Sequence, residues 1–385
     1  RGPRLRRPAH RRGGLSVTAR RVLIAGAGPV GLAAAVEFRR RGFAPRIVDA
    51  GEGPTPEDQS RALGVLPRTL DILAASGITD RLLAEGNRIS RMAVADNGKR
   101  LFEMIAAPAH TAHPFILTLP QGRTERLMIA WLAAHDVDVE WGVAFHTVAD
   151  THAPRVTLST GEIVPADIVV GADGAHSAVR EDVGIPWSGA GYPAEFALAD
   201  VVFDKPVDPA VGRIDLRSGS ADPGGAVAML PLGARRGRYV GIAPSTEALI
   251  GNVPGIESVT WASRFHVSFR HAERMAKGRV FLAGDAAHVH SPVGGRGMNL
   301  GIWDAATLAF LASEARETEY EMRRLPSVRS VMEATRRGTD FIAAPPPAAL
   351  LAMRYLMPLA AGTPWLRGRI ADRILGLDLP QPEWL

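Results

Sequence analysis

The chain has 385 residues, which is more than one hydrophobic core usually serves, so we expect at least two domains. It contains no cysteine, which excludes disulfides, thiolate metal sites and a cysteine nucleophile. The net charge of +5 does not indicate nucleic-acid binding, because residues 1–21 hold eight arginines and the remainder has 37 basic against 40 acidic side chains.

The first 20 residues are rich in arginine and contain no acid. They have neither the apolar core of a secretion signal nor clear amphipathic spacing, so we expect a disordered extension rather than a targeting segment. The longest mainly apolar stretch, 348–366, is interrupted by Arg354, Pro358 and Pro364. We therefore expect no transmembrane segment, no nucleic-acid partner and a cytoplasmic location.

A glycine-rich turn follows the first apolar run, residues 22–25. Gly26, Gly28 and Gly31 are followed by residues with helical apolar spacing, which predicts a strand, a tight turn and a helix. Gly26 permits the turn, Gly28 lets a pyrophosphate approach the backbone, and Gly31 lets the helix pack closely on its strand. The helix start offers free N–H groups to the anion. This pattern predicts a dinucleotide site.

A second predicted strand, residues 45–48, ends at Asp49, which lies 18 residues beyond Gly31. A carboxylate at this place accepts hydrogen bonds from the hydroxyls of an adenosine ribose. The residues alone leave open whether the dinucleotide is NAD or FAD.

The next segments predict a mixture of helices and strands. Leu63, Leu66, Leu70 and Leu73 have helical spacing, and Arg61 stands at the loop-to-helix junction before them. Asn97-Gly98 predicts a hairpin turn. Helical spacing returns at 121–135, and a strand pair is expected within 139–158.

Two further strand-to-glycine-turn motifs occur later in the chain. ADIVVGADGAHSAVR spans 166–180, and RVFLAGDAAHVHSPVGGRGMNLGIWDA spans 279–305. Between them, 192–242 is rich in short alternating strands, which predicts an antiparallel sheet.

This order predicts an α/β fold with a discontinuous Rossmann-like domain, an inserted and mostly antiparallel β-sheet domain, and a helical C-terminal segment. The cofactor domain is expected to comprise 21–88, 120–186 and 263–340. The sheet domain is expected to comprise 89–119 and 187–262, followed by the helical segment 341–385; residues 1–20 form the extension.

Three spaced motifs in this order, GAGPVG at 26–31, GADG at 171–174 and GDAAH at 284–288, closely resemble the single-component FAD-dependent aromatic monooxygenases, the para-hydroxybenzoate hydroxylase-like flavoproteins. The resemblance implies FAD as cofactor and NADPH or NADH as a transient reductant. It also implies O2 and a small aromatic substrate, phenolic or polycyclic, which is hydroxylated through a flavin C4a-hydroperoxide.

The resemblance also implies a set of cofactor residues. Asp49 would bind the adenosine ribose, Arg61 and Gln121 the ribityl and pyrophosphate region, and Asp285 a ribityl hydroxyl, while Asp173 is similar to a residue associated with FAD and nicotinamide binding. The remaining members are the glycine-turn residues Gly26, Gly28, Pro29, Val30 and Gly31, and the residues expected to face the flavin ring, Pro292, Gly294, Gly295, Gly297, Met298 and Asn299.

The substrate pocket carries no motif, and the sequence identifies no catalytic base. Candidate substrate contacts, at the boundary of the sheet and the flavin, are Arg213, Met229, Pro231, Tyr239 and His290. We expect no metal, since His288 and His290 lack ligand spacing. The oligomeric state is left open.

The chain departs from the family pattern in several places. The segments 250–261 and 311–320 are short, Arg296 stands where glutamine is common, and Thr307 where asparagine is common. Two alternatives therefore remain at this point. One is a related flavoprotein of other chemistry, such as an epoxidase, halogenase or reductase, and the other is a flavin-binding protein without turnover.

Overall fold

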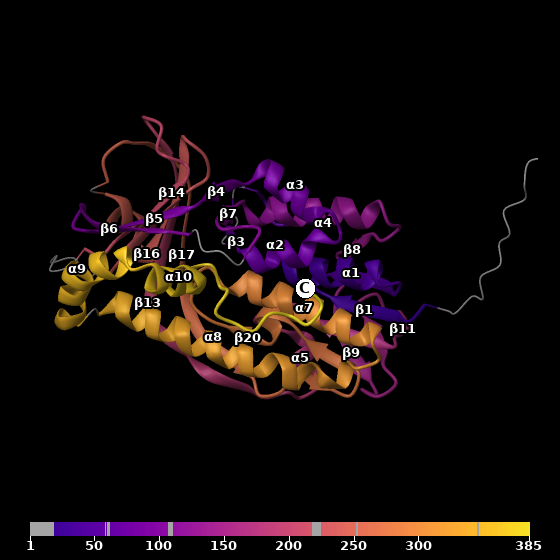
Figure 1. The fold of residues 1–385 in the computed structure, drawn as a ribbon. Helices are drawn as coiled ribbons and strands as arrows, with labels where there is room; N and C mark the ends of the chain where they lie inside the picture. Colours follow the sequence, from indigo (N-terminus) through magenta and orange to yellow (C-terminus); the bar gives the residue numbers. More distant parts are fainter. Residues whose placement is uncertain are drawn as a thin grey trace, which may run out of the picture.

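The computed structural model describes residues 19–57, 59, 62–106, 111–217, 225–251, 253–344 and 346–385. The molecule is elongated and has one large sheet in each half (Figure 1). Apart from Ala19 and Arg20, the predicted N-terminal extension lies outside the described residues.

The first half contains a six-stranded sheet that is parallel except at one edge. In order, its strands are β18 (Ala276–Lys277), β19 (Val280–Leu282), β12 (Ile168–Gly171), β1 (Arg21–Ala25), β2 (Ala44–Asp49) and β8 (Val139–Trp141). One of its two middle strands is β1, which precedes the glycine turn and pairs with β2 on one side and β12 on the other; the remaining strands come from two further regions of the chain.

The second half contains an eight-stranded sheet, antiparallel except for the β14–β5 pair. Its two longest strands, β13 and β17, each have 17 residues. In order, its strands are β20 (His288–Val289), β17 (Ile256–Ala272), β13 (Trp187–Phe203), β16 (Arg236–Ile242), β15 (Val227–Pro231), β14 (Val211–Asp215), β5 (Arg91–Asp96) and β6 (Lys99–Ile105).

Smaller sheets and the helices complete the fold. One three-stranded sheet has the order β11 (Ile163–Pro165), β10 (Arg155–Leu158), β9 (Phe145–Ala149), and another β3 (Gly64–Val65), β7 (Ile116–Thr118), β4 (Asn87–Ile89). The helices are α1 (Pro29–Arg40), α2 (Pro67–Ala74), α3 (Ile78–Glu85), α4 (Gln121–Ala133), α5 (Ala178–Asp182), α6 (Thr246–Ile250), α7 (Gly297–Ser313), α8 (Tyr320–Ala343), α9 (Pro347–Gly362) and α10 (Pro364–Ile374), with 3-10 turns η1 (Gly284–Ala286) and η2 (Glu317–Glu319).

This architecture confirms the predicted fold class, a discontinuous α/β domain combined with a mostly antiparallel sheet and C-terminal helices. The domain limits stay a prediction, and β17 runs through the expected limit at 262–263 as one continuous strand. The hairpin at Asn97-Gly98 is also confirmed, with positive φ at both residues, as its turn requires.

One local prediction was wrong and another needs a refinement. The helix expected from Leu63 begins only at Pro67, because Gly64 and Val65 pair with β7 and the fixed φ of proline suits the first helical position. The strand pair expected within 139–158 is confirmed, because β9 and β10 pair with each other; β8, earlier in this segment, joins the parallel sheet beside β2.

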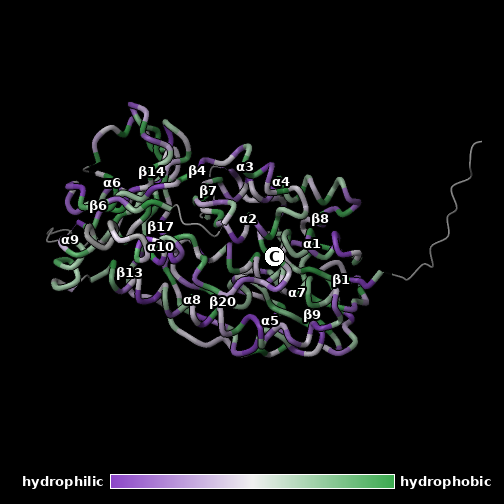
Figure 2. Tube along the Cα trace, viewed as in Figure 1, coloured by the Kyte–Doolittle hydropathy of each residue, from purple (hydrophilic) through white to green (hydrophobic). Residues whose placement is uncertain are grey.

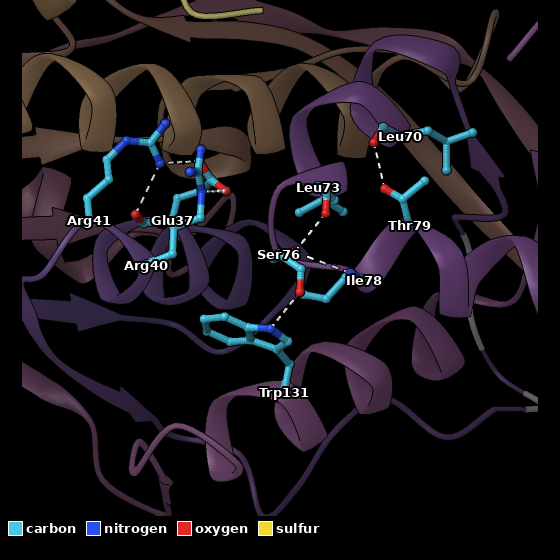
Figure 3. A network of polar contacts seen from close by, with 9 residues as sticks. All are labelled: Glu37, Arg40, Arg41, Leu70, Leu73, Ser76, Ile78, Thr79 and Trp131. Carbon is cyan, nitrogen blue, oxygen red and sulfur yellow. Dashed lines mark hydrogen bonds and ion pairs between the residues drawn. The ribbon is translucent and has the colours of Figure 1, made fainter. Parts of the chain in front are cut away.

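The core of the first half is apolar and is locked by a few buried polar contacts. Figure 2 shows hydrophobic chain where α1, β1 and α7 meet. On α1 the fully buried carboxylate of Glu37 is paired with Arg40 and Arg41 (Figure 3). Nearby, the Trp131 indole of α4 donates to the Ser76 carbonyl at 2.8 Å, which ties α4 to the α2–α3 turn.

Helix α8 links the two halves. Near its start, the Tyr320 hydroxyl donates to the carbonyl of Leu282 in the parallel sheet. Near its end, Asp340 accepts from Tyr192 of β13, and Ile342 packs against the antiparallel sheet. Figure 1 shows this helix running beside both halves.

A buried ion network fixes α7 against α8 and η1. The Asp304 carboxylate, which has no solvent exposure, accepts from Arg324 Nε at 2.7 Å and from the Gly284 N–H at 3.1 Å, and it contacts His288 Nε2 at 2.6 Å. Burial by itself raises the pKa of Asp304, but Arg324 and His288 outweigh burial and hold that pKa below its ordinary value.

Replacing Asp304 by Asn should leave the buried Arg324 guanidinium without its counter-charge. We expect the free energy of unfolding to fall by about 3 to 5 kcal/mol in urea titrations at pH 7. Glu333→Gln is the matched control, since it removes an ion pair with Arg337 on α8 whose partners are about two-thirds exposed, and should cost less than about 0.5 kcal/mol. Equal losses in the two variants would contradict this role for Asp304.

Candidate functional site

The glycine turn between β1 and α1 has the geometry of a phosphate cradle. Gly26 has φ +101°, and a Cβ there would lie 2.3 Å from the Ala172 carbonyl oxygen. A Cβ on Gly31 would lie 1.8 Å from the Gly26 oxygen. At Gly28, by contrast, a Cβ would have no described protein atom within 4 Å. The turn is therefore packed by protein on its inner side and open at Gly28, where an anion can approach.

The start of α1 completes this cradle. Gly28 is the N-cap and Pro29 the first helical residue, so the first N–H groups have no intrahelical acceptor. The first turn of α1 contains no acidic side chain to neutralise the positive end of the helix. An anionic group at Gly28 would therefore be stabilised by the helix. The side chain of Val30 points instead toward Gly284 and Gly301, where added Cβ atoms would meet it at 2.7 and 2.5 Å.

Asp49 lies at the end of β2 and is fixed by two backbone donors. Its Oδ2 accepts from the Ala27 N–H at 2.6 Å, and its Oδ1 accepts from the Gly51 N–H at 2.7 Å. A carboxylate has about four lone-pair sites, so both oxygens can still accept from hydroxyl groups. Asp49, the residue predicted to bind the ribose, thus lies beside the glycine turn and is held in a defined orientation.

Two other predicted carboxylates have unused hydrogen-bonding capacity. Asp173 follows β12 next to Gly26; its Oδ2 accepts from the Val179 N–H, while its buried Oδ1 has no partner among the described residues. The exposed Asp285 carboxylate makes no hydrogen bond to any described residue. The surrounding protein desolvates both groups and raises both pKa values. Each is suited to accept from a ligand hydroxyl or amide.

The loop from Pro292 to Gly295, which we call the flavin loop, precedes α7. Gly295 donates its N–H to the Pro292 carbonyl at 2.9 Å, and Gly294 and Gly295 have φ of +82° and +62°. Pro292, Gly294 and Gly295 are exposed. Helix α7, which begins at Gly297, has no acidic residue in its first turn. Its N-terminus can therefore stabilise negative charge on a ligand placed against the loop.

Asn299 joins the flavin loop to the rest of the site. Its Oδ1 accepts from the Leu66 N–H and the Thr69 hydroxyl, and its Nδ2 donates to the Gly64 and Gly295 carbonyls. All four hydrogen bonds of this side chain are therefore made within the protein. Asn299 positions the loop, and a direct contact of its side chain with the flavin stays a prediction.

Met298 and Gln121 lie beside this junction. Met298 is partly buried and packs against the main core. Gln121 begins α4; its backbone N–H donates to the Ala62 carbonyl, and its side chain donates to Glu125 at 2.8 Å. Arg61, predicted to bind near the pyrophosphate, lies outside the described residues.

The two departures from the family pattern near α7 have defined partners. The buried Arg296 donates to the Arg373 carbonyl at 2.5 Å and pairs with Asp378 at 2.8 Å, so it ties the flavin loop to the C-terminal segment. The Thr307 hydroxyl donates to the Trp303 carbonyl within α7. Sequence reasoning noted both departures but missed the partners, because no local pattern indicates a contact with residues near 375.

His290 precedes the flavin loop and is held neutral. Its Nδ1 contacts the Ser291 carbonyl oxygen at 2.9 Å, while its buried Nε2 has no partner among the described residues. Desolvation, with additional repulsion from His288 and Arg296, lowers the pKa of His290 to about 4. The ring is therefore neutral, and its Nε2 is buried beside the loop without a partner among the described residues.

The two faces of the large sheet have different neighbours. Val293 of the flavin loop packs with Phe196, Val240 and Ile242, which therefore mark the flavin-side face. Side chains alternate along a strand, and a Cβ on Gly241 would meet Leu249 of α6 at 3.2 Å, so α6 covers the opposite face.

Three predicted substrate contacts lie on the face that α6 covers. Arg213, Met229 and Tyr239 are direct cross-strand neighbours there. Pro231 ends β15 on the same face, and its carbonyl accepts from Thr118 and Asn87. This placement argues against contact between these side chains and a substrate at the flavin loop. Of the predicted substrate residues, only His290 lies beside the loop.

The flavin-side face carries half-buried apolar side chains that the sequence did not single out. Leu230, Val240 and Ala228 alternate with the predicted residues along β15 and β16, and Ile214 continues the strip onto β14. The predicted residues and the residues on the flavin-side face are adjacent in sequence, so they point to opposite faces of the sheet. Period-two alternation predicts two faces, but which face meets the cofactor depends on the distant flavin loop.

Together these features fit FAD. The open Gly28 position and the acid-free start of α1 suit a pyrophosphate. The unpartnered oxygens of Asp173 and Asp285 suit hydroxyl groups. The acid-free start of α7 suits an electron-accepting ring. Among the described residues, no cluster of histidine, aspartate or glutamate is arranged to hold a metal ion. None of the described helices combines the length and apolar composition needed to cross a membrane.

A family model described as "FAD binding domain" matches residues 19–248 and 241–335. The chain belongs to this family. A curated relative, 6-methylpretetramide 4-monooxygenase from Streptomyces rimosus, is 34% identical over 92% of this chain and 68% of its own length. This chain is accordingly an FAD-dependent monooxygenase with a para-hydroxybenzoate hydroxylase-like fold.

Solved structures support the same assignment. The anhydrotetracycline hydroxylase of Streptomyces rimosus superimposes with a TM-score of 0.73 at 30% identity, covering 94% of the monooxygenase described here and 77% of its own chain. The p-nitrophenol 4-monooxygenase of Pseudomonas putida has a TM-score of 0.80, covering 94% and 99%; at 21% identity it shows the fold alone.

Gly28→Ala tests the phosphate cradle without disturbing the protein. Its backbone is extended, with φ −69° and ψ −178°, and the added methyl group meets no described protein atom, so stability should be unchanged. FAD affinity, measured by flavin fluorescence quenching, should fall at least roughly tenfold, or about 1.4 kcal/mol. Gly53→Ala, which also adds a methyl group into open space, should bind FAD as the parent does. Retained affinity in Gly28→Ala would place the pyrophosphate elsewhere.

The depressed pKa of His290 predicts a stability change in acid. The unfolded histidine, near pKa 6.5, takes up a proton before the folded one does, so stability is complete above pH 6.5 and is lost as pH falls toward about 4. Between pH 7 and 5 the apoprotein should lose about 1 to 2 kcal/mol more than the His290→Gln variant in urea unfolding. If the free energy of unfolding changed equally with pH in the two proteins, the pKa of His290 would not be depressed in the folded state.

Proposed function

We propose that this monooxygenase hydroxylates a fused-ring phenol bound between the flavin loop and the apolar strip Ile214, Ala228, Leu230 and Val240. The strip is the observation that carries the proposal, because these side chains are half-buried on the sheet face against which the flavin loop packs. Ligand pockets typically combine such apolar walls with a few polar groups.

The length of the strip favours more than one ring. Neighbouring strands lie about 4.8 Å apart, so side chains on β14, β15 and β16 span roughly 10 Å. This is longer than a single aromatic ring. The names of two relatives, a 6-methylpretetramide monooxygenase and an anhydrotetracycline hydroxylase, also refer to polycyclic compounds.

The residues of this chain bind and orient the reactants. The Gly28 turn and the start of α1 hold the pyrophosphate, and Asp49 and Asp285 accept hydroxyl groups of the ribose and the ribityl chain. The N-terminus of α7 stabilises negative charge at the edge of the flavin ring. When bound, FAD supplies the oxygen-activating chemistry after reduction by NADPH or NADH. The apolar strip orients the aromatic ring and excludes water.

The purified protein should be yellow after loading with FAD, and it should oxidise NADPH or NADH faster when a fused-ring phenol is added. The product should gain one oxygen atom from 18O2, as measured by mass spectrometry. A single-ring phenol is the comparison compound and should have a kcat/KM at least roughly tenfold lower. If the yellow protein consumed NAD(P)H without adding oxygen to any phenol, the proposed activity would be excluded.

Leu230→Trp tests which sheet face meets the substrate. It places a large ring in the proposed pocket and should lower kcat/KM at least roughly tenfold, with FAD affinity unchanged. Val259→Trp is the matched control, since Val259 is 46% exposed and lies in the same sheet on the opposite face. A larger loss in the control than in Leu230→Trp would move the substrate to the other face.

A further inference from the structure

A cavity of about 200 Å3 lies on the face of the large sheet that α6 covers, away from the flavin loop. Its floor is Met229, and Arg213 and Tyr239 stand on either side as the cross-strand neighbours of Met229. Phe203 packs edge-on against Tyr239, with ring centroids 6.4 Å apart. The turns at 204–207 and 253–255 also line the cavity.

The cavity is separated from the flavin site in two ways. Its side chains alternate with those of the flavin-side face, as Tyr239 does with Val240. Along β13, Phe203 also lies seven residues beyond Phe196, which packs in the same cluster as the flavin loop. At about 3.3 Å per residue this is roughly 23 Å of strand. A ligand in this cavity would not touch the flavin.

The positive charges at the cavity are not balanced by the residues that the structure describes. Arg213 and Lys205 line it, are both exposed, and have no hydrogen-bond or ion-pair partner among the described residues. Asp204 is the single acidic residue in the lining. The Tyr239 hydroxyl likewise has no partner in the described part of the chain, and burial raises its pKa, so it stays a neutral donor. These groups favour an anion.

The size and walls restrict the anion further. The volume is below the roughly 300 to 1,000 Å3 of sites that hold drug-sized molecules, which favours a ligand with one ring. Two aromatic side chains and Met229 provide surfaces on which a flat ring can pack. A guanidinium beside them can bind a carboxylate through two parallel N–H groups.

We propose that this cavity is a binding site for an aromatic monocarboxylate, distinct from the site of hydroxylation. The carboxylate is held by Arg213 and Lys205 and accepts from the Tyr239 hydroxyl, and the ring packs against the half-buried side chain of Tyr239. The strands β14, β15 and β16 form one wall of each site, so the same three strands contact both ligands.

Benzoate is the probe, titrated into the FAD-loaded protein by calorimetry. We expect saturable binding to one site per chain. Benzamide, which lacks the charge, and acetate, which lacks the ring, should each bind at least roughly tenfold more weakly. No saturation with benzoate, or equal affinity for benzamide, would overturn the proposal.

Variants locate the site. Arg213→Gln should weaken benzoate binding about tenfold and Tyr239→Phe several-fold, with urea midpoints unchanged because Arg213 is exposed and Phe keeps the ring. Arg236→Gln is the matched control: it removes an exposed arginine of β16 that alternates onto the other face, and binding should be unchanged. Leu230→Trp on the flavin side should also leave benzoate affinity unchanged. Loss of binding in Leu230→Trp but not in Arg213→Gln would place benzoate in the flavin-side pocket and exclude the second site.

Discussion

The candidate cofactor site depends on one buried carboxylate. Asp304 contacts the Gly284 N–H, His288 and Arg324, and so holds the GDAAH turn, α7 and α8 in one arrangement. Removing any of these partners from the buried charge would destabilise the folded state. This requirement restricts how the three elements can pack. This arrangement therefore fixes the positions of the exposed Asp285 and of the start of α7.

Close packing and openness alternate around the same groove. At Gly26 and Gly31 the backbone approaches so closely that no side chain fits, whereas at Gly28 the space is left free for a ligand. Asn299 supports the flavin loop, because one of its four hydrogen bonds holds the Gly295 carbonyl while the other three fix the side chain to Gly64, Leu66 and Thr69.

The sequence predicted the parts of the fold that are encoded locally. The turn glycines, Asp49, the hairpin at Asn97-Gly98 and α4 follow from short-range spacing, and three separated motifs were enough to indicate the family. The sheet face that meets the flavin loop depends on Val293, more than 50 residues from β15 and β16, so the alternation of Met229 and Leu230 could not identify it. The pairing of Arg296 with Asp378 is non-local for the same reason.

That pairing has a consequence for how the enzyme can move. Arg296 lies between the flavin loop and α7, yet its guanidinium is bound to Arg373 in the last turn of α10 and to Asp378 beyond the end of that helix. A shift of α10 would therefore be transmitted through this guanidinium to the backbone between the flavin loop and α7. The C-terminal segment thus limits how far the start of α7 can move independently of α10.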